Sequence, residues 1–228
     1  MQRLAGHDNP SPSFSADTPE NQDQREADRL RLLMRTAKLV TSQGEFLCVL
    51  RDASVGGFRA RIFHPLPTDA EMELELASAH RYPIEKVWEK DNEAGFRFTE
   101  KIALEELVNE LTPYPKRGVR LNLELETDIQ VGDQRARATL ENLSQQGARI
   151  DTLQPLAQAQ RLLLNITGMR AVTAQVRWRD GDTYGLAFED TFQFDELALL
   201  VYQLQRQQSA RKGIRSDPAA PLRRIDLR

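Results

Sequence analysis

Alternating apolar and polar positions recur in short runs along most of the chain, a spacing typical of half-buried β-strands. The clearest runs cover residues 58–63, 71–76, 120–125 and 172–178. Turn signals rich in Gly, Asp and Asn separate these and the less regular β-prone runs between them. Many short strands joined by turns predict a small antiparallel β-barrel.

The barrel pattern occurs twice, because the chain contains an internal repeat. The turn Asp52-x-Ser54-x-x-Gly57 returns as Asn142-x-Ser144-x-x-Gly147, and the two copies are 90 residues apart. The same separation relates three further pairs, which are Trp88 and Trp178, Gly95 and Gly185, and Phe98 and Phe188. We interpret the chain as two copies of one module, with the two tryptophans packed at equivalent places in the core or rim of each barrel.

Two segments have helical spacing instead, with apolar residues at positions i, i+3, i+4 and i+7. These residues are Leu104, Leu107, Val108 and Leu111, then Leu197, Leu200, Val201 and Leu204. The spacing predicts a helix after each module, at about 102–111 and 195–207. The fold class is therefore mainly β: two tandem six-stranded antiparallel barrels, each followed by a C-terminal α-helix.

Charge and composition divide the rest of the chain. Residues 1–27 are polar and acidic and are expected to be a disordered tail, and residues 209–228 form a basic tail. The first barrel then spans residues 28–112 and the second spans 113–208. The net charge of −3 gives no global bias toward nucleic acid or anionic membrane.

Several functional classes are disfavoured by the absence of their motifs. The single cysteine, Cys48, excludes an internal disulfide, and its apolar surroundings favour a buried thiol. The histidines His7, His64 and His80 are scattered, so no metal site is predicted. The sequence has no phosphate loop or hydrolase motif, so we expect no enzyme. No run approaches the roughly 20 apolar residues of a membrane span, and no signal peptide begins the chain, so a cytoplasmic location is expected.

The repeated turns and the basic residues before them resemble the PilZ domain. The resemblance covers residues 29–207 and rests on a basic R-x-x-x-R element, the D/N-x-S-x-x-G turn, and a Gly-x-x-Phe before a helix. It implies a six-stranded β-barrel that binds cyclic di-GMP, a bacterial second messenger, under the wrapping basic element. It also implies that some members have lost the ligand. No other cofactor is expected.

The chemistry of these residues suits that ligand. Arginine presents a planar fork of donors that matches phosphate oxygens and the O6 and N7 edge of guanine, and it can stack on a base. The turn residues add donors and acceptors, and their glycine permits a close approach. The candidate ligand residues are Arg31, Arg35, Asp52, Ser54 and Gly57 in the first module, and Lys116, Arg117, Arg120, Asn142, Ser144 and Gly147 in the second.

The two copies differ in their basic elements. The first keeps R-x-x-x-R in Arg31 and Arg35, but only 17 residues separate Arg35 from Asp52. These arginines could therefore flank a packed helix or strand and bind nothing. The second has Lys116 in place of the first arginine, with 22 residues from Arg120 to Asn142. Lysine lacks the fork, although Arg117 could compensate. The family spacing favours the second site slightly.

We therefore carry three hypotheses. The leading one is a non-enzymatic cyclic di-GMP receptor that relays the signal to an unidentified protein partner. The alternative is a degenerate tandem PilZ module that no longer binds nucleotide and serves as a protein-interaction or structural adaptor. Nucleic-acid binding is the weakest, because the net charge is near neutral and paired aromatic residues are scarce.

Overall fold

The computed structural model describes residues 34–68, 71–102 and 118–211. Both predicted tails, apart from residues 209–211, lie outside these ranges. So does the helix predicted after the first barrel, apart from residue 102. Of the candidate ligand residues, Arg31, Lys116 and Arg117 also lie outside the described part.

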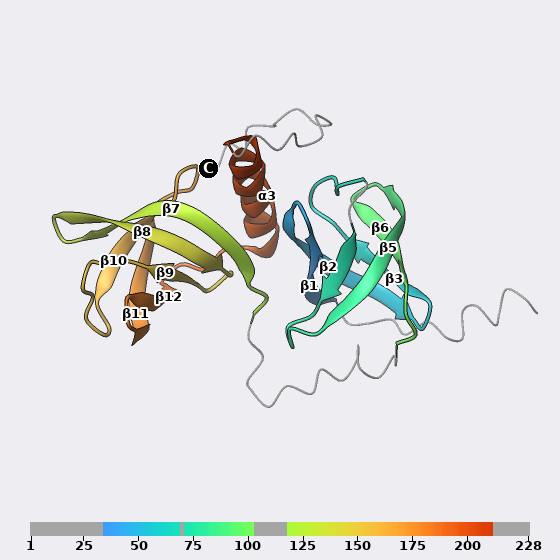
Figure 1. Cartoon of the computed structure of the whole chain (residues 1–228), viewed down its shortest axis with the longest axis horizontal. Helices are drawn as coiled ribbons and strands as arrows, with labels where there is room; N and C mark the ends of the chain where they lie inside the picture. Colours follow the sequence, from blue (N-terminus) through green and yellow to red (C-terminus); the bar gives the residue numbers. More distant parts are fainter. Residues whose placement is uncertain (1–33, 69–70, 103–117, 212–228) are drawn as a thin grey trace, which may run out of the picture.

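The described strands close into two barrels of the same topology (Figure 1). The first barrel contains β1 (Arg35–Thr41), β2 (Gly44–Ser54), β3 (Gly57–Arg61), β4 (Met72–Glu75), β5 (Arg81–Lys90) and β6 (Glu93–Phe98). The second contains β7 (Leu121–Val131), β8 (Gln134–Leu143), β9 (Gly147–Asp151), β10 (Arg161–Asn165), β11 (Val172–Asp180) and β12 (Thr183–Phe188). The first closes in the order β1-β2-β3-β6-β5-β4, and the second in the matching order β7-β8-β9-β12-β11-β10, with antiparallel pairs throughout. This confirms the prediction of two six-stranded antiparallel barrels.

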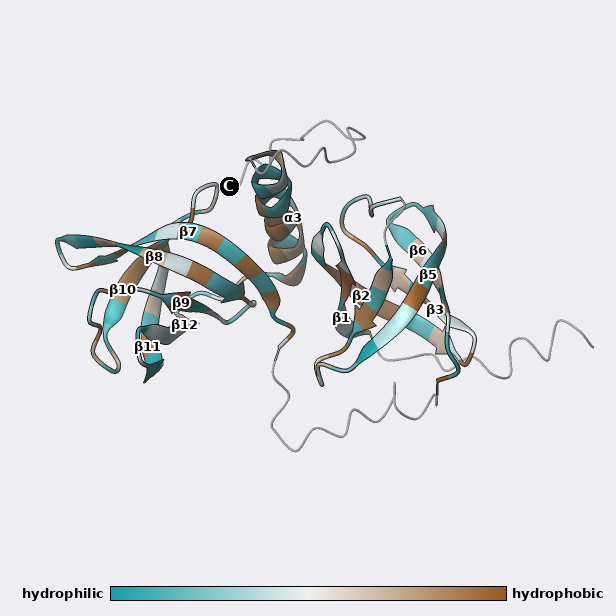
Figure 2. Ribbon diagram, viewed as in Figure 1, coloured by the Kyte–Doolittle hydropathy of each residue, from teal (hydrophilic) through white to brown (hydrophobic). Residues whose placement is uncertain are grey.

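Alternation places the apolar residues inside each barrel, as Figure 2 shows along β7 and β8. Leu39, Leu50 and Leu74 are fully buried in the first core, and Leu140 and Ile150 in the second. Burial of each such side chain stabilises the fold by about 1.5–3 kcal/mol. A one-residue slip would turn a whole strand's apolar set to solvent, so this pattern also fixes the strand register.

The C-terminal helix α3 (Phe194–Arg211) lies between the two barrels (Figure 1). Leu197, Val201 and Leu204 are buried in the core of the second barrel. Tyr202 packs instead against the first core, and Gln205 bonds to its β2 strand. The helix predicted at 195–207 is confirmed, and its two faces join the barrels. No helix within the described ranges has the length and apolar character needed to cross a membrane.

Candidate functional site

Each repeated turn joins the second and third strands of its barrel, and its serine closes it. The Ser54 hydroxyl donates to the Gly57 carbonyl at 3.2 Å, and the Ser144 hydroxyl donates to the Gly147 carbonyl at 3.0 Å. Short polar side chains often tighten turns in this way. Both serine hydroxyls are therefore engaged within the turn.

The turn glycines allow close strand packing. A Cβ on Gly57 would lie 2.2 Å from the Phe96 carbonyl oxygen, and one on Gly147 would lie 2.1 Å from that of Leu186. No side chain fits at these distances, because the Cβ would meet backbone atoms that cannot easily move. Each glycine thus holds its turn against the neighbouring strand, β6 or β12.

A row of four paired residues crosses the outer face of each barrel beside this turn. We call Asp52, Arg59, Gly95 and Trp88 the first row, because each is the strand partner of the next. The second row is Asn142, Arg149, Gly185 and Trp178, paired in the same way. Each row thus combines a short polar side chain, a guanidinium, a bare backbone and an indole.

The row glycine makes room for the tryptophan. A Cβ on Gly95 would lie 2.0 Å from Trp88 Nε1, and one on Gly185 would lie 2.0 Å from Trp178 Nε1. Each indole therefore covers its glycine, and it keeps an exposed fraction of 43% for Trp88 and 41% for Trp178. The tryptophans lie at equivalent places on the outer faces of the two barrels, as the repeat predicted, but they are partly exposed and not packed in the cores, and each offers a flat apolar surface.

Sequence reasoning missed the row arginines, Arg59 and Arg149. Each follows its turn glycine by two positions, and the two are 90 residues apart, so the repeat carried the signal. In the first barrel, a cavity of about 510 Å³ lies over the row and is lined by Asp52, Arg59 and Trp88 among others.

The rows differ in how their arginine is paired. In the first, Arg59 binds Asp52 at 2.8 Å and Glu93 at 3.2 Å. The hydrogen bond and charge of Asp52 raise the pKa of Arg59 above its ordinary value. In the second row, Arg149 binds Glu141, the residue just before the motif.

This difference leaves the motif residue of the second row more available. Asp52 is already neutralised by Arg59 inside its own barrel. The Asn142 side chain, in contrast, has no hydrogen-bond partner among the residues that the structure describes. Its amide can both donate and accept, which suits the edge of a nucleobase.

The basic elements also lie differently against the two rows. Arg35 is a strand residue of β1 and pairs with Leu50, two positions before Asp52. For Arg35 this matches the alternative in which the arginine belongs to a strand, and Arg31 lies outside the described residues. Arg120 immediately precedes β7, whose Leu121 pairs with Leu143 and whose Asn122 pairs with Asn142. The second element therefore runs directly into the strand beside its row.

Other chemistry is not supported within the described ranges. No three His, Cys, Asp or Glu side chains there converge on a site that could hold a metal ion. The Cys48 thiol is fully buried, and burial raises its pKa to about 12, so it is not a nucleophile.

Comparison with solved structures finds similar proteins at low identity. The PlzA protein of Borreliella burgdorferi in complex with c-di-GMP is 11% identical, with a TM-score of 0.33, and the match covers 80% of this chain and 97% of that one. The Bacillus subtilis inhibitor of motility (MotI/DgrA) is 17% identical, with a TM-score of 0.31 and coverage of 79% and 100%. YcgR of Escherichia coli in complex with c-di-GMP is 14% identical, with a TM-score of 0.29 and coverage of 85% and 92%.

The sequence comparisons are more specific in what they cover. No curated protein matches the chain. The family model of the PilZ domain matches residues 116–204, which include the second basic element, the second barrel and most of α3. Residues 116–204 of this chain are therefore a PilZ domain.

Proposed function

We propose that the protein is a receptor for cyclic di-GMP, that its second barrel holds the ligand, and that it relays the signal to a protein partner without catalysis. The observation that carries the proposal is the second row, in which the amide of Asn142 is unpartnered among the described residues and pairs across strands with Arg149, with Trp178 at the other end of the same row. The PilZ domain match over residues 116–204 supports the choice of ligand class.

The residues suit the parts of the ligand as follows. The exposed face of Trp178 and the Arg149 guanidinium can stack on guanine, which has a large π-surface. The Asn142 amide can pair with the edge of the base. Arg117 and Arg120 can bind the phosphates through their forked donors, and Lys116 can add charge without the fork. Ser144 and Gly147 shape the turn on which these groups rest.

We extend the proposal to a tandem arrangement with unequal sites. The first barrel has the same strand order, the same turn and the same row. Its Asp52 is held by Arg59, so a ligand would have to break that ion pair before using either group. Residues Arg31, Arg35, Ser54 and Gly57 therefore stay predicted ligand residues of a weaker site.

Calorimetric titration with cyclic di-GMP tests this on matched positions. We expect the parent to bind with one strong site, and Asn142→Ala to weaken that site by about tenfold or more, a loss of ~1.4 kcal/mol. Asp52→Ala, at the same position of the first barrel, should leave the strong site unchanged. A parent that shows no binding at roughly 50 μM, a range where a weak specific site still gives heat, would overturn the receptor proposal.

One observation favours the adaptor function for the first barrel. Val87 lines its cavity and has an exposed fraction of 62%, and Val55, in the turn whose neighbours Ser54 and Gly56 line the same cavity, has an exposed fraction of 59%. The equivalent positions of the second barrel hold the polar residues Gln145 and Arg177. Exposed apolar residues can mark a surface that binds another protein. If this adaptor role is the only function, excess cyclic di-GMP will leave the melting temperature unchanged, because a ligand selective for the native state must raise it.

A further inference from the structure

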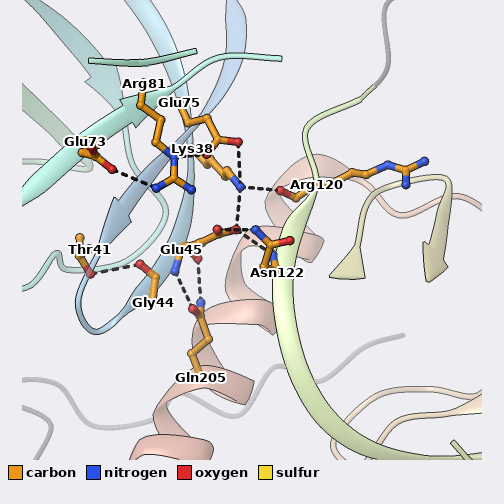
Figure 3. Close-up of polar contacts among 10 residues, drawn as sticks. All are labelled: Lys38, Thr41, Gly44, Glu45, Glu73, Glu75, Arg81, Arg120, Asn122 and Gln205. Atoms are coloured by element: carbon orange, nitrogen blue, oxygen red, sulfur yellow. Dashed lines mark hydrogen bonds and ion pairs between the residues drawn. The ribbon is translucent and has the colours of Figure 1, made fainter. Parts of the chain in front are cut away.

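A buried lysine of the first barrel reaches into the second. Lys38, on β1, has an exposed fraction of 3%. Its ammonium contacts Glu45 at 2.8 Å and Glu75 at 3.0 Å, both in the first barrel, and donates to the Arg120 carbonyl at 3.1 Å (Figure 3). An ammonium has three N–H donors, so these partners use all of them.

The carboxylate of Glu45 holds the next part of the same strand. Its Oε2 accepts the backbone N–H of Asn122 at 2.7 Å, and its Oε1 accepts the Asn122 side-chain amide at 2.7 Å (Figure 3). Lys38 and Glu45 thus fix the backbone on both sides of Leu121. The start of β7 is anchored in the first barrel rather than only in its own.

The helix α3 holds Glu45 in place from the other side. The Glu45 N–H donates to Gln205 Oε1 at 2.7 Å, and Gln205 Nε2 donates to the Glu45 carbonyl at 2.7 Å. The preceding Gly44 has φ of +142°, and a Cβ there would lie 1.9 Å from Gln205 Oε1. Only glycine allows this close seating of the β1–β2 hairpin against the helix.

The anchored stretch leads directly to the second row. Asn122 pairs with Asn142 across β7 and β8. A cavity of about 440 Å³ beside the junction is lined by Glu45, Asn122 and Glu141, and Glu141 is the partner of the row arginine. In Figure 3 the Arg120 side chain extends away from Lys38, on the opposite side of its backbone.

We propose that Lys38, supported by Glu45, is a positioning residue for Arg120. By fixing the Arg120 carbonyl and the following strand, it sets the position from which the Arg120 side chain binds a phosphate of the ligand. This inference rests on the proposed function of the second barrel. A side chain whose backbone is already fixed loses less freedom on binding, so its contact contributes more to affinity.

A double-mutant cycle separates positioning from a general structural role. Cyclic di-GMP affinity is measured for the parent, Lys38→Met, Arg120→Ala and the double variant. If Lys38 acts through Arg120, Lys38→Met weakens binding by about tenfold in the parent but by less than about twofold when Arg120 is already alanine. Equal losses in both backgrounds, or no loss in either, would overturn the inference.

A second pair of variants covers the case in which Lys38→Met does not fold. Gln205→Ala removes the two bonds that hold Glu45, and it should repeat the non-additive loss with Arg120→Ala. Gln208→Ala is the matched control, because Gln208 lies one helical turn later and donates to the Glu124 carbonyl of β7 at 2.7 Å. It should leave affinity unchanged, and a loss equal to that of Gln205→Ala would overturn the inference.

The two proposals fail differently. A parent that binds, with additive losses in the cycle, removes the positioning role and leaves the receptor function intact. A parent that does not bind removes both.

Discussion

Replacing Lys38 by methionine should destabilise the whole protein. The substitution leaves the carboxylates of Glu45 and Glu75 without their shared cation in a site where Lys38 is almost fully buried. Removing one partner of a buried ion pair typically costs about 3–5 kcal/mol. Glu45 keeps its bonds from Asn122, and Glu75 keeps Arg81 at 2.8 Å. Because each carboxylate retains a donor, we expect a loss near the lower end, about 3 kcal/mol.

Urea denaturation followed by circular dichroism measures this loss, with thermal melting beside it. For a chain of this size, about 3 kcal/mol corresponds to a drop of roughly 6–12 °C in melting temperature. Lys90→Met is the matched control. The Lys90 side chain is 80% exposed, and its ammonium makes only a long ion pair of 3.8 Å with the Asp91 carboxylate. Lys90→Met should cost less than about 0.5 kcal/mol. A loss below about 1 kcal/mol for Lys38→Met would refute the reasoning, because the two carboxylates would then need no buried cation.

Two further predictions concern the pH dependence and the second row. Burial lowers the pKa of His64 from 6.5 to about 4, so its neutral form is favoured in the folded state. Its contribution to stability is present above pH 6.5 and is lost as the pH falls to about 4, which amounts to about 3 kcal/mol. The His64→Phe variant should not show this pH-dependent loss. Denaturation at several pH values measures the free energy of unfolding of both proteins. Gly185→Ala should lower cyclic di-GMP affinity about tenfold, because the new Cβ would displace the Trp178 indole. Gly95→Ala in the first barrel should leave the affinity of the strong site unchanged. If titration shows that both variants lose affinity equally, the assignment of the strong site to the second barrel is wrong.

The strands could be predicted from the sequence because their signals are local. Alternation along residues 58–63 and 172–178 set both the strand type and the buried face, and Gly-containing turns marked the ends. The repeat then predicted a second barrel, since a segment that folds as a barrel once does so again with the same pattern, whereas the strand order came only from the structure. The signal that predicted α3 was also local, because it lay in the i, i+3, i+4 spacing of its apolar residues.

The partners of Lys38 could not be predicted in this way. In its strand, Lys38 lies between Ala37 and Leu39, both fully buried, and lysine at such a position normally faces solvent. It is buried because Arg120, 82 residues later, and Glu75, on a neighbouring strand, come against it. No periodic pattern in the sequence predicts a contact between residues so far apart along the chain.

Two adjacent positions explain why two rows of the same geometry differ in electrostatics. The residue before the motif is Arg51 in the first barrel and Glu141 in the second. Glu141 draws Arg149 to itself, and the motif position beside it holds neutral Asn142. Without a carboxylate at position 51, Arg59 instead pairs with the motif Asp52. In the first barrel the motif is intact, but its Asp52 is already paired with Arg59. The second barrel instead keeps the Asn142 amide of its motif available for a ligand.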